Sequence, residues 1–396
     1  MNISHKLKNI SILKREYARS ITLLTGALIA GFFAVGQISS KNSTGDVTDI
    51  TQVQKLDTNS LYYKIWQPYI AILDSQTYIA TYGLQLTGKT DMGDILCSVS
   101  KDRGKTWGHP ITIFSSQEGK YGYANSVLYK SPEQDIIWCY AMRCVKYYKN
   151  TEESELVAAY SGDGGVTWIP VELQVDFQSP LITNASILSI KDERGTKYLL
   201  AVHRNTKHYD PYGDRRQFVL ESRDLLRWKL AGYIPMPEGK EIFLCEGNMA
   251  LEENNKDIKI VMRTADYKDP AHVQVNPPRA YSSISKDDGK TWSPAKEEPT
   301  LYNTNSKGFF GRDSKGHYVY VYNDGLVGQR TSLRYVVKSS GKDWSGPRLF
   351  YWDANRNSYA TLIEEKPGVF ICVWDSSDDI KRARTVIRFG RLDLNQ

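Results

Sequence analysis

A short pattern, Ser-x-Asp-x-Gly-x-Thr-Trp, occurs three times in this chain at nearly constant spacing. The complete copies begin at Ser100, Ser161 and Ser285. Two incomplete copies begin at Ser222, which lacks the glycine, and at Ser339, which lacks one residue and the aspartate. Successive copies therefore start 61, 61, 63 and 54 residues apart. A period of this size predicts a radial array of β-sheet blades.

Each copy has the composition of a β-hairpin turn. The aspartate can accept hydrogen bonds from backbone N–H groups, the glycine tolerates positive φ, and the tryptophan is large enough to anchor the turn. The pattern lacks the later bidentate glutamate that a calcium-binding loop requires. We therefore assign the repeats to the scaffold and expect them on the face opposite the functional site.

Length and composition agree with one large all-β domain. The chain has 396 residues, is 41% hydrophobic and contains 26 tyrosines and 9 tryptophans. Strand-like runs recur, for example at 77–82, 258–262 and 317–322. We predict a six-bladed β-propeller over residues 55–396, with roughly 55 residues in each blade. The run 384–392 is expected to pair with the first blade and close the ring.

The N-terminus has the features of an export signal. Residues 1–20 carry five basic side chains and one acidic one, and residues 21–38 carry no charge. This order predicts a signal peptide or an N-terminal membrane anchor over 1–38, followed by a linker over 39–54. In either case we expect an exported protein, which is periplasmic, held at the cell surface or secreted.

Charge and cysteine content exclude some classes of partner. The formal net charge is +6, but most of it belongs to residues 1–20, so the remaining chain is nearly neutral and nucleic-acid binding is not expected. The five cysteines are irregularly spaced, which predicts buried apolar residues. A Cys139–Cys144 bridge is the alternative, and no zinc site, other metal or cofactor is expected.

The repeats resemble those of the sialidase (neuraminidase) superfamily, whose members carry Asp-box, or BNR, repeats. The resemblance covers the whole chain after residue 38. It implies a six-bladed propeller that cleaves glycosides of an acidic sugar. It also implies arginines that hold the sugar carboxylate, a tyrosine nucleophile activated by a glutamate, and an aspartate that protonates the leaving group.

Two segments in the middle of the chain resemble the family's glutamate and second arginine. These residues are Glu246, within 245–248, and Arg263, within 261–264. The midpoint between them lies at Asn254 and Asn255, which are good turn residues. A hairpin closed there makes Glu246 and Arg263 cross-strand partners. A structural ion pair on a solvated face is the alternative interpretation.

The resemblance continues toward the C-terminus and before the first repeat. Arg330, within 323–333, resembles the family's third arginine, and Tyr359, within 357–362, resembles its nucleophile. A strand tyrosine packed at a blade edge is the alternative role for Tyr359. Asp91 lies nine residues before Ser100, where the family places its acid, and Asp94 is the competing carboxylate.

The chain departs from the family at the start of the first blade. The family has an arginine there, in Arg-Ile-Pro, and this chain reads Trp66-Gln67-Pro68. Lys64 lies two residues earlier on the same face of a strand and is a candidate substitute for the missing charge. Restoring an arginine at position 66 is expected to improve turnover of N-acetylneuraminic substrates.

The resemblance implies a retaining exo-glycosidase of the exo-α-sialidase type that removes terminal sialic acid, or a related acidic sugar, from glycans. Its catalytic residues are Asp91, Glu246 and Tyr359, and its substrate-binding residues are Arg263, Arg330, Trp66 and Lys64. We expect a monomer whose partner is the glycan.

Two alternatives stay open. One is a lyase or hydrolase of uronic-acid glycans that uses His203-Arg204 with Tyr209 and Arg215. The other is a non-catalytic glycan-binding propeller.

Overall fold

The computed structural model describes the greater part of the chain after residue 45. The described ranges are 46–54, 64–85, 92–117, 119–145, 153–178, 180–182, 186–204, 216–240, 242–264, 279–304, 306–324, 330–377 and 384–396. The chain divides into two units, Met1–Lys41 and Asn42–Gln396, and every described residue belongs to the second. The predicted signal peptide or anchor at 1–38 lies outside the described residues.

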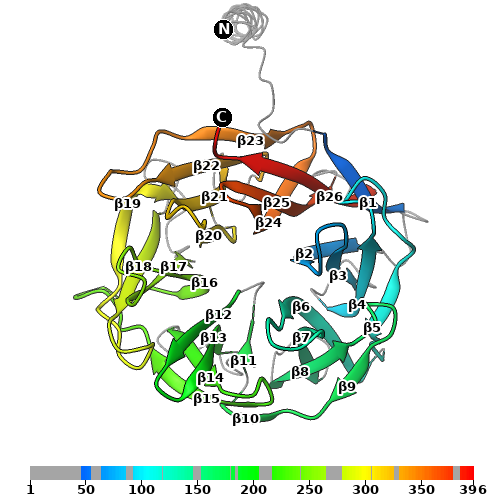
Figure 1. Ribbon diagram of the computed structural model, residues 1–396, viewed down its shortest axis with the longest axis horizontal. Helices are drawn as coiled ribbons and strands as arrows, with labels where there is room; N and C mark the ends of the chain where they lie inside the picture. The colour runs from blue at the N-terminus through cyan, green and yellow to red at the C-terminus, as the bar shows by residue number, and fades with distance from the viewer. Residues whose placement is uncertain are drawn as a thin grey trace, which may run out of the picture. The chain divides into compact units, whose positions relative to one another are not determined.

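Every regular element of the described residues is a β-strand. A search of these residues found no helix with the length and hydrophobicity needed to cross a bilayer. The strands form five hydrogen-bonded sheets around a common centre, which is the arrangement of a propeller (Figure 1). The prediction of an all-β propeller is therefore confirmed.

Three of the sheets have four strands each. They are β16(Leu244–Leu251)-β17(Ile258–Thr264)-β18(Arg279–Ser285)-β19(Lys296–Tyr302), β20(Phe309–Arg312)-β21(Tyr318–Asp324)-β22(Ser332–Lys338)-β23(Arg348–Trp352), and β24(Arg356–Lys366)-β25(Val369–Ser377)-β26(Arg384–Asp393)-β1(Thr48–Gln54). Of the strand-like runs seen in the sequence, 258–262 falls in β17, and all but the first residue of 317–322 falls in β21.

The other two sheets are larger. The six-stranded sheet contains β10(Gln174–Asp176), β11(Pro180–Leu181), β12(Ile187–Asp192), β13(Gly195–Arg204), β14(Gln217–Ser222) and β15(Arg227–Tyr233). The eight-stranded sheet contains β2(Lys64–Ile72), β3(Tyr78–Gln85), β4(Gly93–Ser100), β5(Ile111–Phe114), β6(Tyr121–Lys130), β7(Ile137–Val145), β8(Glu153–Ser161) and β9(Ile169–Val171).

The predicted count of six separate four-stranded sheets is not found among the described residues. The reason lies at Gly93, which pairs with Tyr123 and thereby joins β4 to β6 in one hydrogen-bonded sheet. A Cβ at position 93 would lie 1.8 Å from the carbonyl oxygen of Leu84, so only glycine fits this close approach.

The ring closes through the two ends of the described chain. Strand β26 pairs with β25 on one side and with β1 on the other. Residues 48–54, which the sequence analysis assigned to the linker, are therefore a strand of the last sheet. The C-terminal run does not pair with β2–β5 as expected, because the N-terminal strand crosses over to join it (Figure 1).

Each complete repeat forms the predicted turn, as the copy at Ser161 illustrates. The Ser161 hydroxyl accepts a hydrogen bond from the N–H of Gly165 at 2.8 Å. The Asp163 carboxylate accepts hydrogen bonds from the hydroxyl of Thr167 at 2.6 Å and from its N–H at 2.9 Å, which lowers the Asp163 pKa to about 2. The Trp168 indole donates to the Gly165 carbonyl at 3.1 Å. These contacts confirm the capping role predicted for the aspartate.

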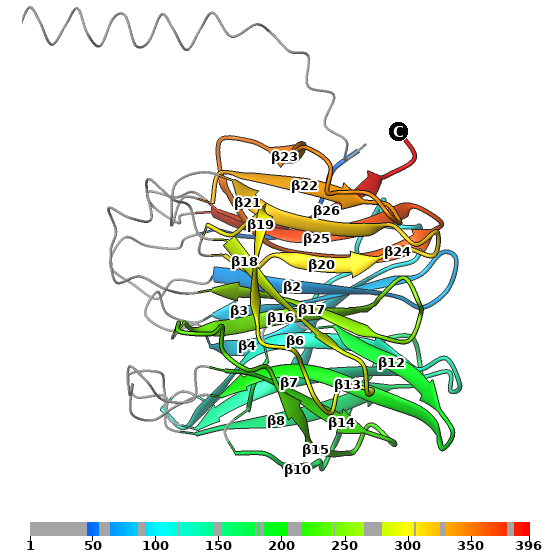
Figure 2. The ribbon, with the colours of Figure 1, turned by 90° about the vertical axis from the view of Figure 1, so that its left-hand side faces the viewer.

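The repeats lie at one end of the strands, and Glu246 and Arg263 lie at the other. In the β16–β19 sheet, Leu251 pairs with Ile258, which pairs with the repeat's Ser285. Cys245 pairs with Arg263 at the opposite end of the same two strands. Figure 2 shows the strands running between the two ends of the ring. The repeats are therefore opposite the candidate site, as predicted.

Candidate active site

Four strands, β2, β6, β16 and β24, carry the same irregularity in the pairing with the strand that follows each of them. In β2, β6, β16 and β24, three steps along the strand match two steps along its partner, so each strand contains one extra residue. The first residue inside each bulge has a positive φ: Gln67 (53°), Asn125 (54°), Glu246 (54°) and Tyr359 (55°). Bulges of this kind redirect side chains at the ends of sheets. Glu246 and Tyr359 are therefore equivalent positions of the repeat.

Glu246 and Arg263 meet across the predicted hairpin. Its turn contains Asn254, whose side chain accepts hydrogen bonds from two following N–H groups, and Asn255 at φ 54°. The Arg263 Nη1 atom donates to Glu246 Oε2 at 2.7 Å, and the two side chains are only 11% and 9% exposed. The side chains thus meet across the hairpin as predicted, although the register partner of Arg263 is Cys245 and Glu246 lies in the bulge that follows it. The ion pair is largely buried and not on a solvated face.

Tyr359, Arg330, Trp66 and Lys64 form one contiguous cluster. The ring centroids of Trp66 and Tyr359 lie 5.4 Å apart. The guanidinium carbon of Arg330 lies 4.9 Å from the Tyr359 ring and 5.9 Å from the Trp66 ring. The Lys64 ammonium lies 2.9 Å from the Trp66 centroid, on the same strand face as predicted. Four residues singled out in the sequence thus come together from three distant segments.

Arg356 belongs to the same cluster, although sequence reasoning did not identify it. Its guanidinium carbon lies 5.3 Å from the Trp66 ring centroid. It lies three residues before Tyr359 at the start of β24, and it is half-buried, whereas Trp66, Arg330 and Tyr359 are buried. Its proximity to Tyr359 in the chain was the only available signal, and many arginines flank strands in this sequence.

Asn357 connects the segment that carries Arg330 to the segment that carries Tyr359 through hydrogen bonds. Its N–H donates to the Arg330 carbonyl at 2.7 Å, and its side-chain amide donates to the Thr331 carbonyl at 3.2 Å. The side-chain amide of Asn323 in turn donates to the Asn357 carbonyl at 2.5 Å. Because Asn357 is fully buried, these contacts hold the two backbones in a fixed relation.

Asp375 connects the segment that carries Tyr359 to the strand that carries Trp66 through hydrogen bonds. Its carboxylate accepts hydrogen bonds from the Ser358 hydroxyl at 2.6 Å and from the Gln67 N–H at 3.2 Å. Burial raises the Asp375 pKa, against the opposing effect of these hydrogen bonds and of Arg356 and Arg330 nearby. This carboxylate links β24 and β2 behind the Trp66–Tyr359 contact.

Lys307 is a second residue that sequence reasoning missed. Its ammonium donates to the Ala360 carbonyl at 3.3 Å and to the Thr361 hydroxyl at 3.1 Å, and Thr361 donates to the Pro68 carbonyl at 3.1 Å. Burial lowers the Lys307 pKa to about 7, although Glu246 and Asp375 favour its charged form. Lys307 therefore supports the backbone immediately after Tyr359.

Of the two candidate acids, Asp94 alone lies within the described residues. Asp91 lies outside the described residues. Asp94 accepts hydrogen bonds from the N–H and the hydroxyl of Ser116 at 2.7 and 2.6 Å. Asp94 therefore caps the segment at Ser116, which is a structural role.

The histidine cluster of the alternative function is only partly described, because Tyr209 and Arg215 lie outside the described residues. His203 is 8% exposed, and its ring lies 6.1 Å from that of Phe243. Burial lowers the His203 pKa to about 4, so its imidazole is neutral near pH 7. The Arg204 guanidinium packs over Phe177 and Phe218. Both residues thus have structural contacts.

The cysteines are buried, as predicted, and free. Cys139 and Cys144 lie on the same strand, β7, and form no bridge. Within the described ranges, no three His, Cys, Asp or Glu side chains are grouped so that they could hold a metal ion.

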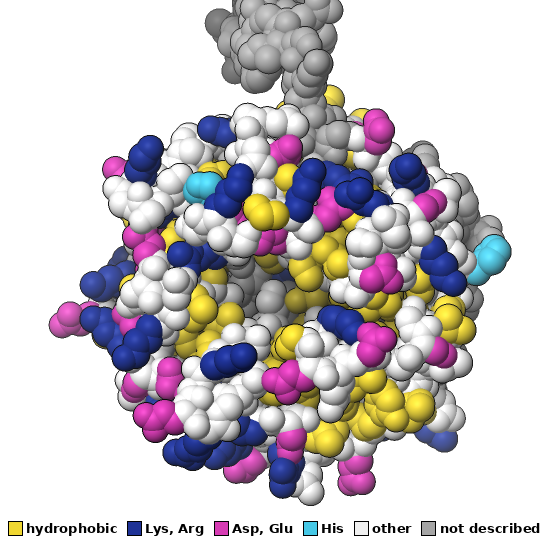
Figure 3. Space-filling view, viewed as in Figure 1, with side chains coloured by type: hydrophobic (Ala, Val, Ile, Leu, Met, Phe, Trp, Pro, Cys, Tyr) yellow, Lys and Arg dark blue, Asp and Glu magenta, His cyan; other side chains and the backbone are white. Residues whose placement is uncertain are grey.

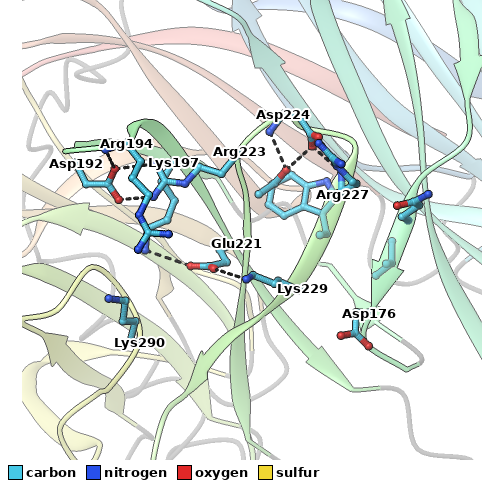
Figure 4. Close-up of a pocket in the computed structure, with 14 residues that line it drawn as sticks. Asp176, Asp192, Arg194, Lys197, Glu221, Arg223, Asp224, Arg227, Lys229 and Lys290 are labelled. Atoms are coloured by element: carbon cyan, nitrogen blue, oxygen red, sulfur yellow. Dashed lines mark hydrogen bonds and ion pairs between the residues drawn. The ribbon is translucent and has the colours of Figure 1, made fainter.

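A cavity of about 680 Å³ lies away from this site, beside the incomplete repeat at Ser222 (Figure 4). Three of its four carboxylates are engaged in ion pairs: Asp192 with Arg223, Asp224 with Arg227, and Glu221 with Lys197 and Lys229. The Arg223 guanidinium holds the Asp192 pKa well below its usual range. Acidic and basic side chains are likewise interspersed over the face in Figure 3. We therefore place the candidate site at the Trp66–Tyr359 cluster.

Comparisons with known proteins agree with this fold. The family model of the BNR repeat-like domain matches residues 77–372. No curated protein matches the sequence significantly. The Hadza microbial sialidase Hz136 superposes with a TM-score of 0.64 at 18% identity, over 84% of this chain and 66% of that one. The NanB sialidase from Streptococcus pneumoniae gives a TM-score of 0.66 at 12% identity, over 88% and 70% of the two chains.

A protein of unknown function from Dyadobacter fermentans DSM 18053 gives a TM-score of 0.61 at 14% identity, over 88% of this chain and 100% of that one. At such identities the similarity shows a shared fold alone. The chain spans 66% of the length of the Hadza sialidase. The family model covers most of the chain, and the repeats it describes form the observed turns. The chain therefore belongs to the BNR repeat-like family, as a sialidase-like BNR-repeat protein.

Proposed function

We propose that this protein is a retaining exo-glycosidase of the sialidase type, which releases terminal sialic acid or a related acidic sugar from glycans. One observation carries the proposal. Tyr359 lies in contact with the Arg330 guanidinium, at the end of the ring where the buried Glu246–Arg263 pair is also found. A tyrosine beside a guanidinium combines a neutral nucleophile with a group that binds carboxylates.

In the proposed first step, the Tyr359 oxygen forms a bond to the anomeric carbon as the bond to the leaving oxygen breaks. Glu246 takes the tyrosine proton, and Asp91 gives a proton to the leaving oxygen. In the second step Asp91 takes a proton from water, whose oxygen bonds to the anomeric carbon as the bond to the Tyr359 oxygen breaks, and Glu246 returns its proton to the tyrosine oxygen. Two displacements at the same carbon retain its configuration.

The electrostatics favour a tyrosine in this role. The anomeric carbon of such a sugar bears a carboxylate, which repels an anionic nucleophile. Arg263 and Arg330 would hold that carboxylate through charge-assisted hydrogen bonds, and the ion pair with Arg263 fixes the Glu246 carboxylate. The glycan is the only partner that we propose.

We also propose that the ring consists of six blades. The eight-stranded sheet has a bulged first strand in each half, β2 and β6, and a complete repeat in each half, at Ser100 and Ser161. The two halves meet at one residue pair, Gly93 and Tyr123. A crystal structure would count the blades directly.

Export through residues 1–38 is likewise a proposal, based on the charge pattern of the segment. Cell fractionation of a strain that expresses the full chain tests it. Recovery in the cytoplasm with an intact N-terminus would contradict it.

The function is tested by release assays on glycosides of N-acetylneuraminic, N-glycolylneuraminic, deaminated sialic and uronic acids. We expect release from one or more sialosides, and its loss in Tyr359→Phe. The control is Tyr233→Phe, which alters an exposed tyrosine on β15. Release of uronic acids alone would favour the lyase or hydrolase alternative. Binding without release from any glycoside would favour a glycan-binding propeller.

A further inference from the structure

Two guanidinium groups, not one, lie beside the aromatic pair at the candidate site. Those of Arg330 and Arg356 lie 5.9 and 5.3 Å from the Trp66 ring centroid. The Asn357 N–H, which follows Arg356 directly, donates to the Arg330 carbonyl. The buried Asn357 thus holds the two arginine-bearing backbones side by side, and the Trp66 indole packs against both cations.

We propose that Arg330 and Arg356 act together to hold one carboxylate of the ligand, with Arg356 as a specificity-determining residue for acidic sugars. This inference rests on the proposed function, because it concerns the same site. A carboxylate has two oxygens and about four lone-pair sites, so it can accept hydrogen bonds from two planar guanidinium groups at once. The buried Trp66 ring lowers the local dielectric and strengthens such bonds.

Arg356 fits this role better than Lys64, the other cation beside Trp66. The Lys64 ammonium lies 2.9 Å from the ring centroid and its residue is only 6% exposed, so the lysine is committed to the indole. Arg356 is half-buried, and it is the most accessible of the three cations around the ring.

The same geometry changes the role of Trp66. With 6% of its surface exposed, the indole offers no open face on which a sugar could stack. Its contacts are instead with Tyr359 and the three cations. In this proposal the Trp66 ring packs against the arginines and positions them, and Arg356 contacts the ligand.

The experiment measures binding by calorimetry, independently of turnover. The probes are the unsaturated analogue of N-acetylneuraminic acid and its methyl ester, which lacks the negative charge. The variants are Arg356→Gln, Arg356→Lys and, as a control, Arg348→Gln, which removes an exposed arginine eight residues earlier. Thermal unfolding of each variant verifies that it is folded.

We expect Arg356→Gln to weaken binding of the acid about 10- to 100-fold while leaving binding of the ester unchanged. Arg356→Lys should give an intermediate loss, because it keeps the charge and loses the planar fork. Arg348→Gln should bind like the unmodified protein. Equal affinity of Arg356→Gln and the unmodified protein for the acid would overturn the proposal.

Two further outcomes separate this inference from the proposed function. If the protein binds the acid through Arg356 but hydrolyses no glycoside, the inference holds and the proposed hydrolysis fails. If the unmodified protein hydrolyses sialosides but Arg356→Gln loses acid and ester binding equally, the hydrolysis holds and the inference fails. Failure of the unmodified protein to bind the acid at all would overturn the inference as well.

Discussion

Glu246 and Tyr359 occupy the same position of the same backbone bulge, on the first strands of two different sheets. Their φ angles are 54° and 55°, and each is the first residue inside a one-residue insertion in its strand. Strands β2 and β6 have Gln67 and Asn125 at the same position of their bulges. The repeat thus supplies equivalent places at one end of the ring, and the chain fills two of them with groups suited to proton transfer and nucleophilic attack.

The backbone of these bulges can be tested at Asn125, which lies apart from the proposed chemistry. A non-glycine residue in the left-handed region is strained, and asparagine tolerates it better than a β-branched residue does. We expect Asn125→Val to be less stable than Asn125→Gly by about 1–2 kcal/mol. Urea denaturation of both variants measures this difference. Equal stabilities would mean that the positive φ carries no strain.

Lys307 should make stability depend on pH above neutrality. Its pKa is lowered from 10.5 to about 7 by burial, so between these values the unfolded chain binds more protons than the folded one. The free energy of unfolding should therefore rise with pH from about 7 to 10, by at most about 1.4 kcal/mol per pH unit from this group. Below about pH 7 both states are charged, and the cost of burying the charge is fully present.

In Lys307→Met that rise should disappear, and below pH 7 the variant should be more stable than the unmodified protein. Lys342→Met, which alters an exposed lysine, serves as the matched control. The measurement is urea denaturation at several pH values between 6 and 10. Parallel profiles for the unmodified protein and Lys307→Met would refute the assignment.

Glu246 should be important for stability as well as for the proposed chemistry. Glu246→Gln removes the carboxylate charge that pairs with the Arg263 guanidinium, at a site where the arginine side chain is 11% exposed. Removing one partner of such a pair costs about 3 kcal/mol or more. The double variant Glu246→Gln/Arg263→Gln should recover part of the loss, and a double-mutant cycle measures the coupling. Additive effects of the two changes would indicate that the ion pair is not coupled.

Trp66→Arg, for which the sequence predicts improved turnover of N-acetylneuraminic substrates, should also destabilise the protein. The new guanidinium would replace an indole that attracts Lys64, Arg330 and Arg356, and would add a fourth cation among them. High salt should relieve part of the loss, because it screens repulsion. Trp66→Phe keeps an aromatic ring and should be closer to the unmodified protein in thermal unfolding. A Trp66→Arg variant as stable as Trp66→Phe would contradict this prediction.

The parts of the structure that local patterns encode could be predicted from the sequence. The spacing of the repeats gave the propeller, and Asn254–Asn255 gave the hairpin that joins Glu246 to Arg263. The contacts of Arg356 and Lys307 were not predictable, because they depend on residues from distant strands that meet only in the closed ring. Likewise, nothing local distinguishes 48–54 from a linker, because its partner lies more than 300 residues away.

The pairing of β1 with β26 also sets an order of events during synthesis. The last sheet lacks its final two strands until residues 384–393 have left the ribosome, although β1 is among the first described segments to emerge. Until then β1 has no partner strand, and the edge of β25 that will receive β26 stays open. Unpaired strands of this kind are templates for association with other chains. A truncation that removes β26 would therefore leave both β1 and the edge of β25 unpaired, and aggregation of the nascent protein is the hazard that ring closure removes.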